Sequence, residues 1–379
     1  MFSRGSALQK GLRRGFPVLV PVASIFLTLV LVEIFLAVFF PIPYSMERNM
    51  IFQSDPYTGY RLKPNSIGHF QQGMPAVANG RGHRDDEVAQ EKPDGVYRIL
   101  VLGDSFTVGA NVAQDAAYPQ VLESLLRVRL GEGIEVVNSG VGGWSPFQYA
   151  QYYEHYGREL NPDMVLIGFF VGNDTYSLDS RVEQLRTAVL GRRVSRNAAE
   201  KPATKFLVFL HEHSHLARLL MPRGPVAERV TRDNCSDFSD QYLAIQRTRK
   251  HNHLKESRKR KSTVANNSVR MIRRIHQLAD AQKALAVVVM LPDENQINPA
   301  LQERILKDDD RSRYDFSMPQ SLLSELFSEL HIPTIDLLPA FLADPRCLYM
   351  NDTHWTPEGH RLAAELIASE LVPIIRRND

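Results

Sequence analysis

Short apolar runs alternate with amphipathic segments along the chain from residue 97 onward. Continuous apolar runs, which are typical of buried strands, lie at 99–102, 164–171 and 284–291. Two further strands are expected at 134–137 and 332–337, which mix apolar and polar residues. Helical spacing of apolar residues, or a proline in the first turn, indicates helices at 116–130, 146–160, 264–283 and 357–371. Because apolar strands separated by such helices are covered on both faces, we expect a mostly parallel sheet in a three-layer α/β/α sandwich.

The longest apolar stretch lies near the N-terminus, at residues 17–40. At about 1.5 Å per residue a helix of this length can cross a hydrocarbon core of roughly 30 Å. It exceeds the apolar core of a cleaved signal peptide, about 7–15 residues, so we interpret it as a retained single-pass anchor. The basic residues of segment 1–16 favour a cytoplasmic N-terminus and a periplasmic or otherwise extracytoplasmic domain. The one charge in the stretch, Glu33, marks either a helix–helix contact or, as we prefer, a side chain reaching toward the interface.

The pattern divides the rest of the chain into two parts, the second of which contains an insertion. Residues 41–96 are rich in Gly, Pro and Asn and are interpreted as a linker and an irregular lead-in. Residues 97–379 form the α/β/α domain, with a polar insertion at about 175–263 between the third and fourth strands. The basic run 247–261 is interpreted as a solvated loop, with contact to anionic lipid or an acidic polymer as the alternative.

Composition narrows the chemistry only slightly. A net charge of +2 gives no argument for nucleic acid as a partner. The two cysteines, Cys235 and Cys347, exclude a disulfide-dense scaffold, and either one bridge or two thiols remains open. No cofactor or metal is predicted, since the spacing of His211, His213 and His215 also suits a solvated segment.

Several other side chains are interpreted as structural. His360 falls in the last predicted helix. The tyrosines of the 146–160 segment are better explained by packing than by a platform for sugars; they are Tyr149, Tyr152, Tyr153 and Tyr156.

Two polar motifs occupy positions where catalytic groups can meet. One directly follows a predicted strand, and the other lies in a late loop. Ser105, in Gly-Asp-Ser, follows the first strand, and ligands bind at the carboxyl ends of parallel strands. A serine hydroxyl needs a base to become a good nucleophile, and His354 lies in a loop before the last helix. Asp352 can orient that imidazole, because alternate residues of an extended chain face the same way.

Hydrogen-bond donors for an oxyanion follow the next two strands. The glycine-rich loop 138–143 allows backbone amides to approach a substrate closely, and Asn173 offers a side-chain amide. Three strand ends and one late loop therefore supply a nucleophile, donors and a base.

These blocks resemble the SGNH/GDSL hydrolase family. Gly-Asp-Ser at 103–105, the loop ending at Gly143, Gly-Asn-Asp at 172–174 and Asp-x-His at 352–354 are similar to the family's four blocks, in its order. Segments 59–65 and 79–85 also resemble membrane-anchored bacterial members. The resemblance implies a flavodoxin-like sandwich, with Ser105 as nucleophile, its own amide, Gly143 and Asn173 as oxyanion hole, His354 as base and Asp352 as the acid.

Two positions depart from the family pattern. Phe106 replaces the usual leucine. The usual acid lies three residues before the histidine, where this chain has Asn351, whereas Asp352 lies two before it. The Asp-x-His order is similar to that of alginate-acetylation proteins.

The resemblance and the predicted anchor together imply a function. We expect a serine-dependent esterase that acts on O-acyl groups of a cell-envelope or exported polysaccharide. An O-acyltransferase that uses the same Ser-His-Asp site is the first alternative. The second is a non-catalytic module of this fold that binds a glycan or a membrane protein partner.

Overall fold

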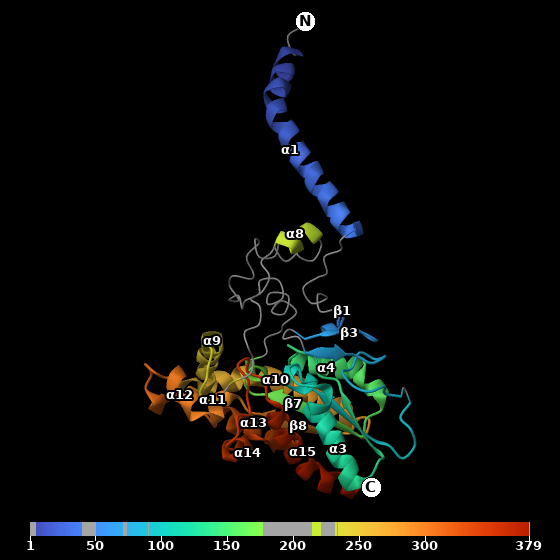
Figure 1. Ribbon diagram of the computed structural model, residues 1–379, viewed down its shortest axis with the longest axis vertical. Helices are drawn as coiled ribbons and strands as arrows, with labels where there is room; N and C mark the ends of the chain where they lie inside the picture. Colours follow the sequence, from blue (N-terminus) through green and yellow to red (C-terminus); the bar gives the residue numbers. More distant parts are fainter. Residues whose placement is uncertain are drawn as a thin grey trace. The chain divides into compact units, whose positions relative to one another are not determined.

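The computed structural model describes residues 5–39, 51–70, 74–89, 91–176, 214–220, 232 and 234–378. The chain divides into two units. The first combines Met1–Arg48 with Leu185–Pro225, and the second combines Asn49–Gln184 with Val226–Asp379. The second unit holds the central sheet (Figure 1), and its residue ranges include all of the candidate site residues.

The second unit is built on a five-stranded parallel sheet in the order β6-β5-β7-β8-β9. Its strands are β5 (Tyr97–Leu102), β6 (Ile134–Asn138), β7 (Met164–Phe170), β8 (Leu285–Leu291) and β9 (Thr334–Asp336). Every residue of β7 is buried, as expected for a central strand covered on both faces. The predicted parallel sheet is confirmed, although β9 is shorter than the strand predicted at 332–337.

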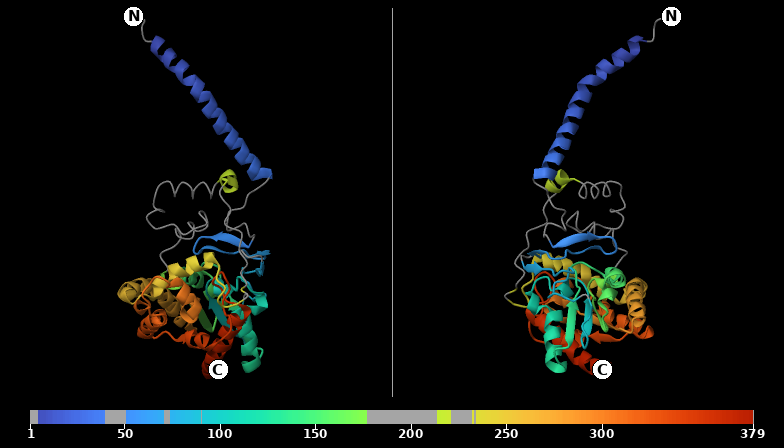
Figure 2. Two further views of the ribbon diagram at one scale, coloured as in Figure 1. Left: turned by 60° about the vertical axis from the view of Figure 1, so that its left-hand side comes forward. Right: turned by 90° about the vertical axis from the view of Figure 1, so that its right-hand side faces the viewer.

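Helices flank the sheet on both sides (Figure 2). The α-helices of this unit are α2 (Ser105–Val108), α3 (Tyr118–Leu130), α4 (Pro146–His155), α9 (Asp240–Arg249), α10 (Arg258–Asp280), α11 (Glu294–Ile297), α12 (Pro299–Ile305), α13 (Met318–Glu329), α14 (Leu338–Ala343) and α15 (Pro357–Asn378). Its 3-10 helices are η2 (Gln114–Ala116), η3 (Gly157–Leu160), η4 (Asp174–Tyr176), η5 (Lys250–His253), η6 (Lys255–Ser257) and η7 (Arg311–Arg313).

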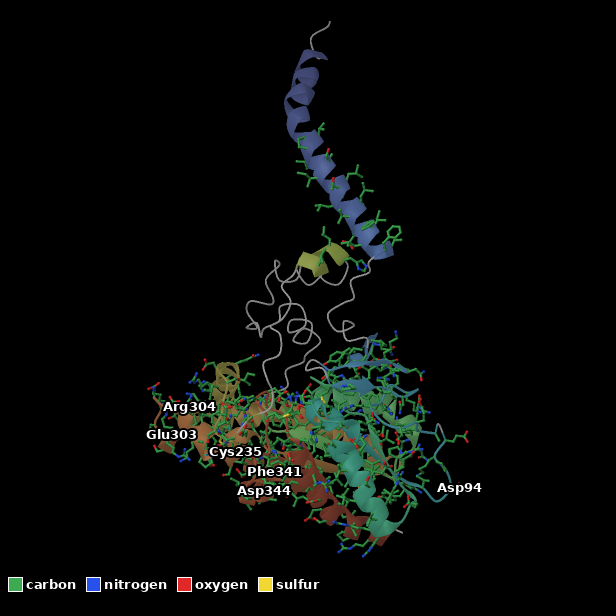
Figure 3. All side chains as sticks on the ribbon, in the orientation of Figure 1. Asp94, Cys235, Glu303, Arg304, Phe341 and Asp344 are labelled. Atoms are coloured by element: carbon green, nitrogen blue, oxygen red, sulfur yellow. A yellow bond between two sulfur atoms is a disulfide. The ribbon has the colours of Figure 1, made fainter. Side chains whose placement is uncertain are left out.

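Alternate residues of the strands face different helices. Ile99 and Val101 of β5 share a core with residues of α3 and α15, which pack on each other. Phe341 of α14, labelled in Figure 3, belongs to the same core. Leu100, which lies between Ile99 and Val101 in β5, faces η3 instead. A Cβ on Gly157 of η3 would come 2.8 Å from Cδ2 of Leu100. On that side α4 packs against α10, so the sandwich has a helix layer on each face.

The lead-in is more regular than its sequence indicates. β1 (Phe52–Asp55) pairs with β2 (Gly59–Leu62), and β3 (Ile67–His69) pairs with β4 (Pro75–Val77), both antiparallel. Asp55 stabilises the first turn, because its Oδ1 accepts hydrogen bonds from the backbone N–H groups of Tyr57 and Thr58, at 3.0 and 2.8 Å. Strands of three or four residues are too short to show an apolar alternation.

The basic run 247–261 is helical, so its interpretation as a solvated loop was wrong. It spans the end of α9, both η5 and η6, and the start of α10. Asn252 and His253 of η5 are buried, and Asn252 donates a hydrogen bond to the backbone oxygen of Gly172, at 3.4 Å. Charged residues are compatible with helices, and the pattern alone did not reveal that η5 packs beside the end of β7. Most of the predicted insertion before α9, including His211 and His213, lies outside the described residues.

In the first unit, α1 (Gly5–Phe39) contains the apolar span Val20–Phe39, which by length and composition fits a membrane helix or a signal sequence. Glu33 contacts α8 (His215–Leu220) rather than standing alone. Its carboxylate accepts hydrogen bonds from the Ser214 hydroxyl at 2.7 Å and from the backbone N–H groups of His215 and Leu216 at 2.5 and 2.9 Å. Glu33 therefore makes a helix–helix contact, and the preferred interpretation, a side chain that reaches toward the membrane interface, stays a prediction.

Cys235 (labelled in Figure 3) and Cys347 form a disulfide, with their Cα atoms 5.2 Å apart. The bridge joins the segment before α9 to the loop that precedes α15, across a sequence separation of 112 residues. The choice between a bridge and two thiols, which composition left open, is thus resolved in favour of the bridge.

Reducing this disulfide should lower the free energy of unfolding by about 4–5 kcal/mol, because a closed loop of this length strongly restricts the unfolded chain. Urea unfolding with and without a phosphine reductant measures the change, with the buried Trp144 and Trp355 as fluorescent reporters. The double variant Cys235→Ser/Cys347→Ser is the control, and its stability should not respond to the reductant. Equal stability of the oxidised and reduced wild-type chains would contradict this prediction.

Candidate active site

Ser105 lies at the turn between the strand β5 and the helix α2. Asp104 caps that helix, since its Oδ1 accepts a hydrogen bond from the backbone N–H of Phe106 at 2.9 Å. Gly103 permits the turn, because a Cβ there would lie 1.9 Å from the Thr107 hydroxyl oxygen. The half-buried Ser105 is therefore held at the carboxyl end of a central strand, as the sequence predicted.

His354 meets Ser105 although 249 positions separate them in sequence. Its Nε2 lies 2.7 Å from the Ser105 hydroxyl oxygen, and its Nδ1 lies 2.8 Å from Oδ2 of Asp352. With Nδ1–H donating to the carboxylate, Nε2 is the acceptor for the serine proton. The structure thus brings the predicted nucleophile, base and acid into one chain of contacts.

A tight turn, rather than extended chain, places Asp352 beside the imidazole. Thr353 has a φ of 85°, in the left-handed region. The backbone N–H of Thr353 donates to the oxygen of Met350 at 3.2 Å, and the N–H of Met350 donates to the oxygen of His354 at 2.8 Å. Our reasoning from alternate residues of an extended strand was wrong, although the two side chains do meet.

Asn351 stands at the position of the usual family acid but contacts other groups. Its Oδ1 accepts hydrogen bonds from Nε of Arg232 at 3.1 Å and from the backbone N–H of Ser239 at 3.3 Å. The side chain is therefore engaged away from the imidazole, which leaves the Asp352 carboxylate as the one that contacts His354.

The glycine-rich loop after β6 passes directly beside Ser105. A Cβ on Gly142 would lie 3.9 Å from that of Ser105, and Gly143 has a φ of 79°. Tyr60 of the lead-in fixes this part of the loop, because its hydroxyl donates to the backbone oxygen of Gly142 at 2.7 Å. The amide at Gly143 is thereby held in a backbone conformation that favours glycine.

Asn173 approaches the same end of the sheet from β7. Its Nδ2 donates to Oδ2 of Asp104 at 2.9 Å. An amide nitrogen has two hydrogens, so this contact orients the group and leaves a second hydrogen for another acceptor. Asp104 thus links α2, the helix that carries Ser105, to the end of β7.

Two buried carboxyl groups hold these blocks together. Burial raises the pKa of Asp104, while hydrogen bonds from Asn173 and from the amide of Phe106 oppose the rise. Burial, and then the charge of Asp104, raise the pKa of Asp174 well above its usual range. Asp174 accepts hydrogen bonds from the backbone N–H of Phe170 at 3.0 Å and from the Tyr149 hydroxyl at 3.1 Å. Both acids therefore serve as acceptors that fix the end of the sheet.

Asn111 is a site residue that the sequence analysis missed. Its Nδ2 contacts Oδ2 of Asp352 and lies 3.0 Å from Nδ1 of His354. No motif contains it, because it lies in the loop after α2. Arg84 holds that loop by donating to the backbone oxygens of Val108 and Val112 at 2.9 and 2.8 Å. The signal nearest to it was segment 79–85, which includes Arg84 and resembles the family's lead-in.

Replacing Asn111 with alanine should lower kcat about tenfold with little change in KM, because the variant loses a hydrogen bond to a charged group that orients the base. Steady-state turnover of p-nitrophenyl acetate measures both constants. Asn267→Ala, at an exposed position of α10, is the matched control and should match the wild type. Wild-type kcat in Asn111→Ala would show that Asp352 needs no such partner.

The residues interpreted as structural lie in packed positions. Nδ1 of the buried His360 accepts a hydrogen bond from the backbone N–H of Tyr118 at 3.2 Å, and burial lowers the pKa of His360 to about 3. Tyr149, Tyr152 and Tyr153 are buried, in agreement with the packing interpretation. The fourth tyrosine, at position 156, donates from its hydroxyl to the Asp55 carboxylate at 2.6 Å and so ties α4 to the first hairpin.

The ring of Phe106 packs against the imidazole of His354. Its ring centroid lies 4.2 Å from that of Phe170, 5.0 Å from that of Trp355 and 5.2 Å from that of His354. A larger ring in place of the usual leucine is therefore accommodated within an aromatic cluster.

Comparisons with known proteins identify a family for this chain. The model of the GDSL-like Lipase/Acylhydrolase family matches residues 101–362, which include all four blocks. Similar solved structures include the acetyl xylan esterase AlAXEase (TM-score 0.40, 14% identity, covering 72% of this chain and 99% of that one) and TesA (0.40, 12%, 73% and 98%). The lipase/acylhydrolase from Enterococcus faecalis is a third (0.35, 15%, 73% and 95%).

None of the curated proteins matches this chain significantly. The family match extends over more than half of the chain, from within β5 to the first turns of α15. The chain therefore belongs to the GDSL-like lipase/acylhydrolase family of ester-bond hydrolases.

Proposed function

We propose that Ser105 is the nucleophile of a serine-dependent esterase, with His354 as general base and Asp352 as its orienting acid. The observation that carries the proposal is the chain of contacts from Ser105 through the imidazole to the carboxylate, at 2.7 and 2.8 Å. Such a chain is what a serine needs to be deprotonated during attack.

The reaction has two halves. The Ser105 hydroxyl oxygen attacks the ester carbonyl while Nε2 of His354 takes its proton. The backbone amides of Ser105 and Gly143 and the second Nδ2 hydrogen of Asn173 donate to the oxyanion of the tetrahedral intermediate. His354 returns the proton to the leaving alcohol, and an acyl-serine remains. Water, activated by the same imidazole, then releases the carboxylic acid and restores the hydroxyl.

The substrate that we propose is an O-acyl group on a cell-envelope or exported polysaccharide. The support is the apolar span Val20–Phe39, taken as a retained anchor with the enzyme on the outer face, and the basic residues that precede it. The Cys235–Cys347 disulfide agrees with an oxidising compartment.

An O-acyltransferase is the second candidate. The specific observation that favours it is the acid two residues before the histidine, which is similar to the order in alginate-acetylation proteins. In that case a sugar hydroxyl, rather than water, would accept the acyl group from Ser105. A non-catalytic module is disfavoured by the contacts between Ser105, His354 and Asp352.

One experiment separates these functions. The full-length chain in detergent is incubated with an O-acetylated polysaccharide, and released acetate is measured by proton NMR. In parallel, p-nitrophenyl acetate and a deacetylated polysaccharide are supplied, and acetyl incorporation into the polymer is measured. Acetate release supports the esterase, and incorporation supports the transferase. Absence of both, together with no labelling by a fluorophosphonate probe, would overturn the catalytic proposal.

A further inference from the structure

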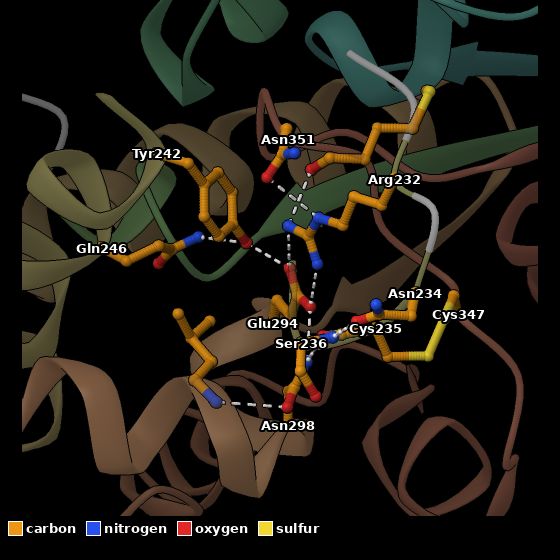
Figure 4. A network of polar contacts seen from close by, with 12 residues as sticks. Arg232, Asn234, Cys235, Ser236, Tyr242, Gln246, Glu294, Asn298, Cys347 and Asn351 are labelled. Carbon is orange, nitrogen blue, oxygen red and sulfur yellow. Dashed lines mark hydrogen bonds and ion pairs between the residues drawn. A yellow bond between two sulfur atoms is a disulfide. The ribbon is translucent and has the colours of Figure 1, made fainter. Parts of the chain in front are cut away.

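A buried ion pair lies next to the turn that carries Asp352 (Figure 4). Both side chains are almost fully buried, with 2% of Arg232 and 4% of Glu294 exposed. The pairing is bidentate, because Nη1 and Nη2 of Arg232 donate to the two carboxylate oxygens at 2.6 and 2.8 Å. A planar guanidinium held in this way has a fixed orientation.

Arg232 uses its remaining donors on the two residues before Asp352. Nε donates to Oδ1 of Asn351 at 3.1 Å, and Nη2 donates to the backbone oxygen of Met350 at 3.0 Å. Cys347, three positions before Met350, is tied by the disulfide to Cys235, three positions after Arg232. The stretch before Asp352 is thus held at one end by Arg232, which contacts Met350, and at the other by the disulfide at Cys347.

Glu294 is itself fixed from the sheet. It begins α11, directly after β8, and accepts hydrogen bonds from the Tyr242 hydroxyl and from Nδ2 of Asn298, the latter at 2.8 Å. The guanidinium of Arg232 also stacks on the Tyr242 ring, 4.5 Å from its centroid. The position of the carboxyl end of β8 is therefore transmitted to Met350 and Asn351 through direct contacts.

We infer that Arg232 is a positioning residue for Asp352, acting through Met350 and Asn351. The inference rests on the proposed role of Asp352 as the acid. A buried ion pair adds little net stability compared with apolar residues of similar size, so its main consequence here is geometric. The ion pair keeps the side chain of Asn351 oriented toward Arg232. Asp352, the next residue, then directs its carboxylate to the imidazole of His354.

Removing the pair should lower kcat between about tenfold and about a hundredfold, the range expected when a catalytic group is displaced by roughly 1 Å. KM should change little, because the contacts of Arg232 are with the turn before Asp352 and are proposed to affect the acid, not substrate binding. The variant to use is Arg232→Met/Glu294→Gln, since Arg232→Met alone would leave a buried unpaired carboxylate. Arg274→Met/Glu154→Gln removes an exposed ion pair and is the matched control.

The decisive measurement is a cycle with Asp352→Asn, made on the full-length chain in detergent with p-nitrophenyl acetate. If Arg232 acts through Asp352, loss of the ion pair should cost less than about threefold in the Asp352→Asn background. Titration of active sites with a fluorophosphonate probe normalises every kcat to folded enzyme. Equal losses in both backgrounds would overturn the inference, because a general structural defect does not depend on residue 352.

A second variant keeps the test independent of the ion pair's contribution to folding. Asn351→Ala removes the side chain that accepts the hydrogen bond from Nε of Arg232 and leaves the Arg232–Glu294 pair intact. The cycle with Asp352→Asn is then measured for this variant. A loss that Asp352→Asn suppresses supports the inference, and wild-type kcat overturns it. Full activity of Ser105→Ala would instead refute the proposed function, and full activity of Asp352→Asn would refute the acid on which the inference rests.

Discussion

Ser105→Ala should lower kcat/KM for p-nitrophenyl acetate by about 10⁴-fold or more and abolish labelling by a fluorophosphonate probe. Without the hydroxyl no acyl-enzyme can form, and only binding and oxyanion contacts would remain to assist direct attack by water. The half-buried Ser105 contacts the imidazole through its hydroxyl, so its removal creates no large cavity and the midpoint of thermal unfolding should stay nearly unchanged.

Ser124→Ala is the matched control for this prediction. Ser124 lies exposed on α3, where its hydroxyl donates to the backbone oxygen of Gln120 at 3.1 Å. This variant should label and turn over like the wild type. Labelling that persisted in Ser105→Ala would place the reactive nucleophile elsewhere in the chain and would contradict the assignment.

Asp352→Asn should lower kcat by about 10³- to 10⁴-fold, the scale known for the equivalent change in Ser-His-Asp triads. An amide at this position can donate to Nδ1, which favours the imidazole tautomer whose Nε2 carries the proton. Such an imidazole cannot accept the proton of Ser105. Steady-state kinetics measure the loss, and the midpoint of thermal unfolding checks that the variant is folded.

A swapped carboxylate distinguishes Asp352 from the usual family position. In Asn351→Asp/Asp352→Asn the new carboxylate should pair with Arg232, whose Nε already donates to Oδ1 of Asn351 at 3.1 Å. We therefore expect the swap to recover less than about tenfold of the activity lost in Asp352→Asn. Recovery close to the wild-type rate would mean that residue 351 can reach His354, contrary to the turn described above.

The parts of the fold that the sequence predicted are those with strong local signals. The strand before Ser105 and the strand Met164–Phe170 are continuous apolar runs, and each is followed by a polar block. Because the carboxyl ends of parallel strands meet at one edge, the sites of Ser105 and Asn173 followed directly from the strand assignments.

The parts that were missed depend on contacts between distant segments. Asn111 is a loop asparagine whose contacts with Asp352 and His354 appear only in the folded chain, where Arg84 holds the loop. The turn at Thr353 requires a positive φ that a threonine seldom adopts, so the sequence suggested extended chain instead. The helical basic run, too, is buried in part by packing beside the end of β7, which charge and periodicity do not reveal.

The separation of 249 positions between Ser105 and His354 has a consequence for synthesis. Ser105, the glycine-rich loop and Asn173 all emerge from the ribosome well before the last strand, and His354 emerges after it. If Ser105 is the nucleophile and His354 its base, as we propose, a nascent chain released before that point would lack the base and should be inert toward esters. Ester turnover would then report completed folding in a co-translational assay, because Ser105 would stay unreactive until the segment that contains His354 packs beside it.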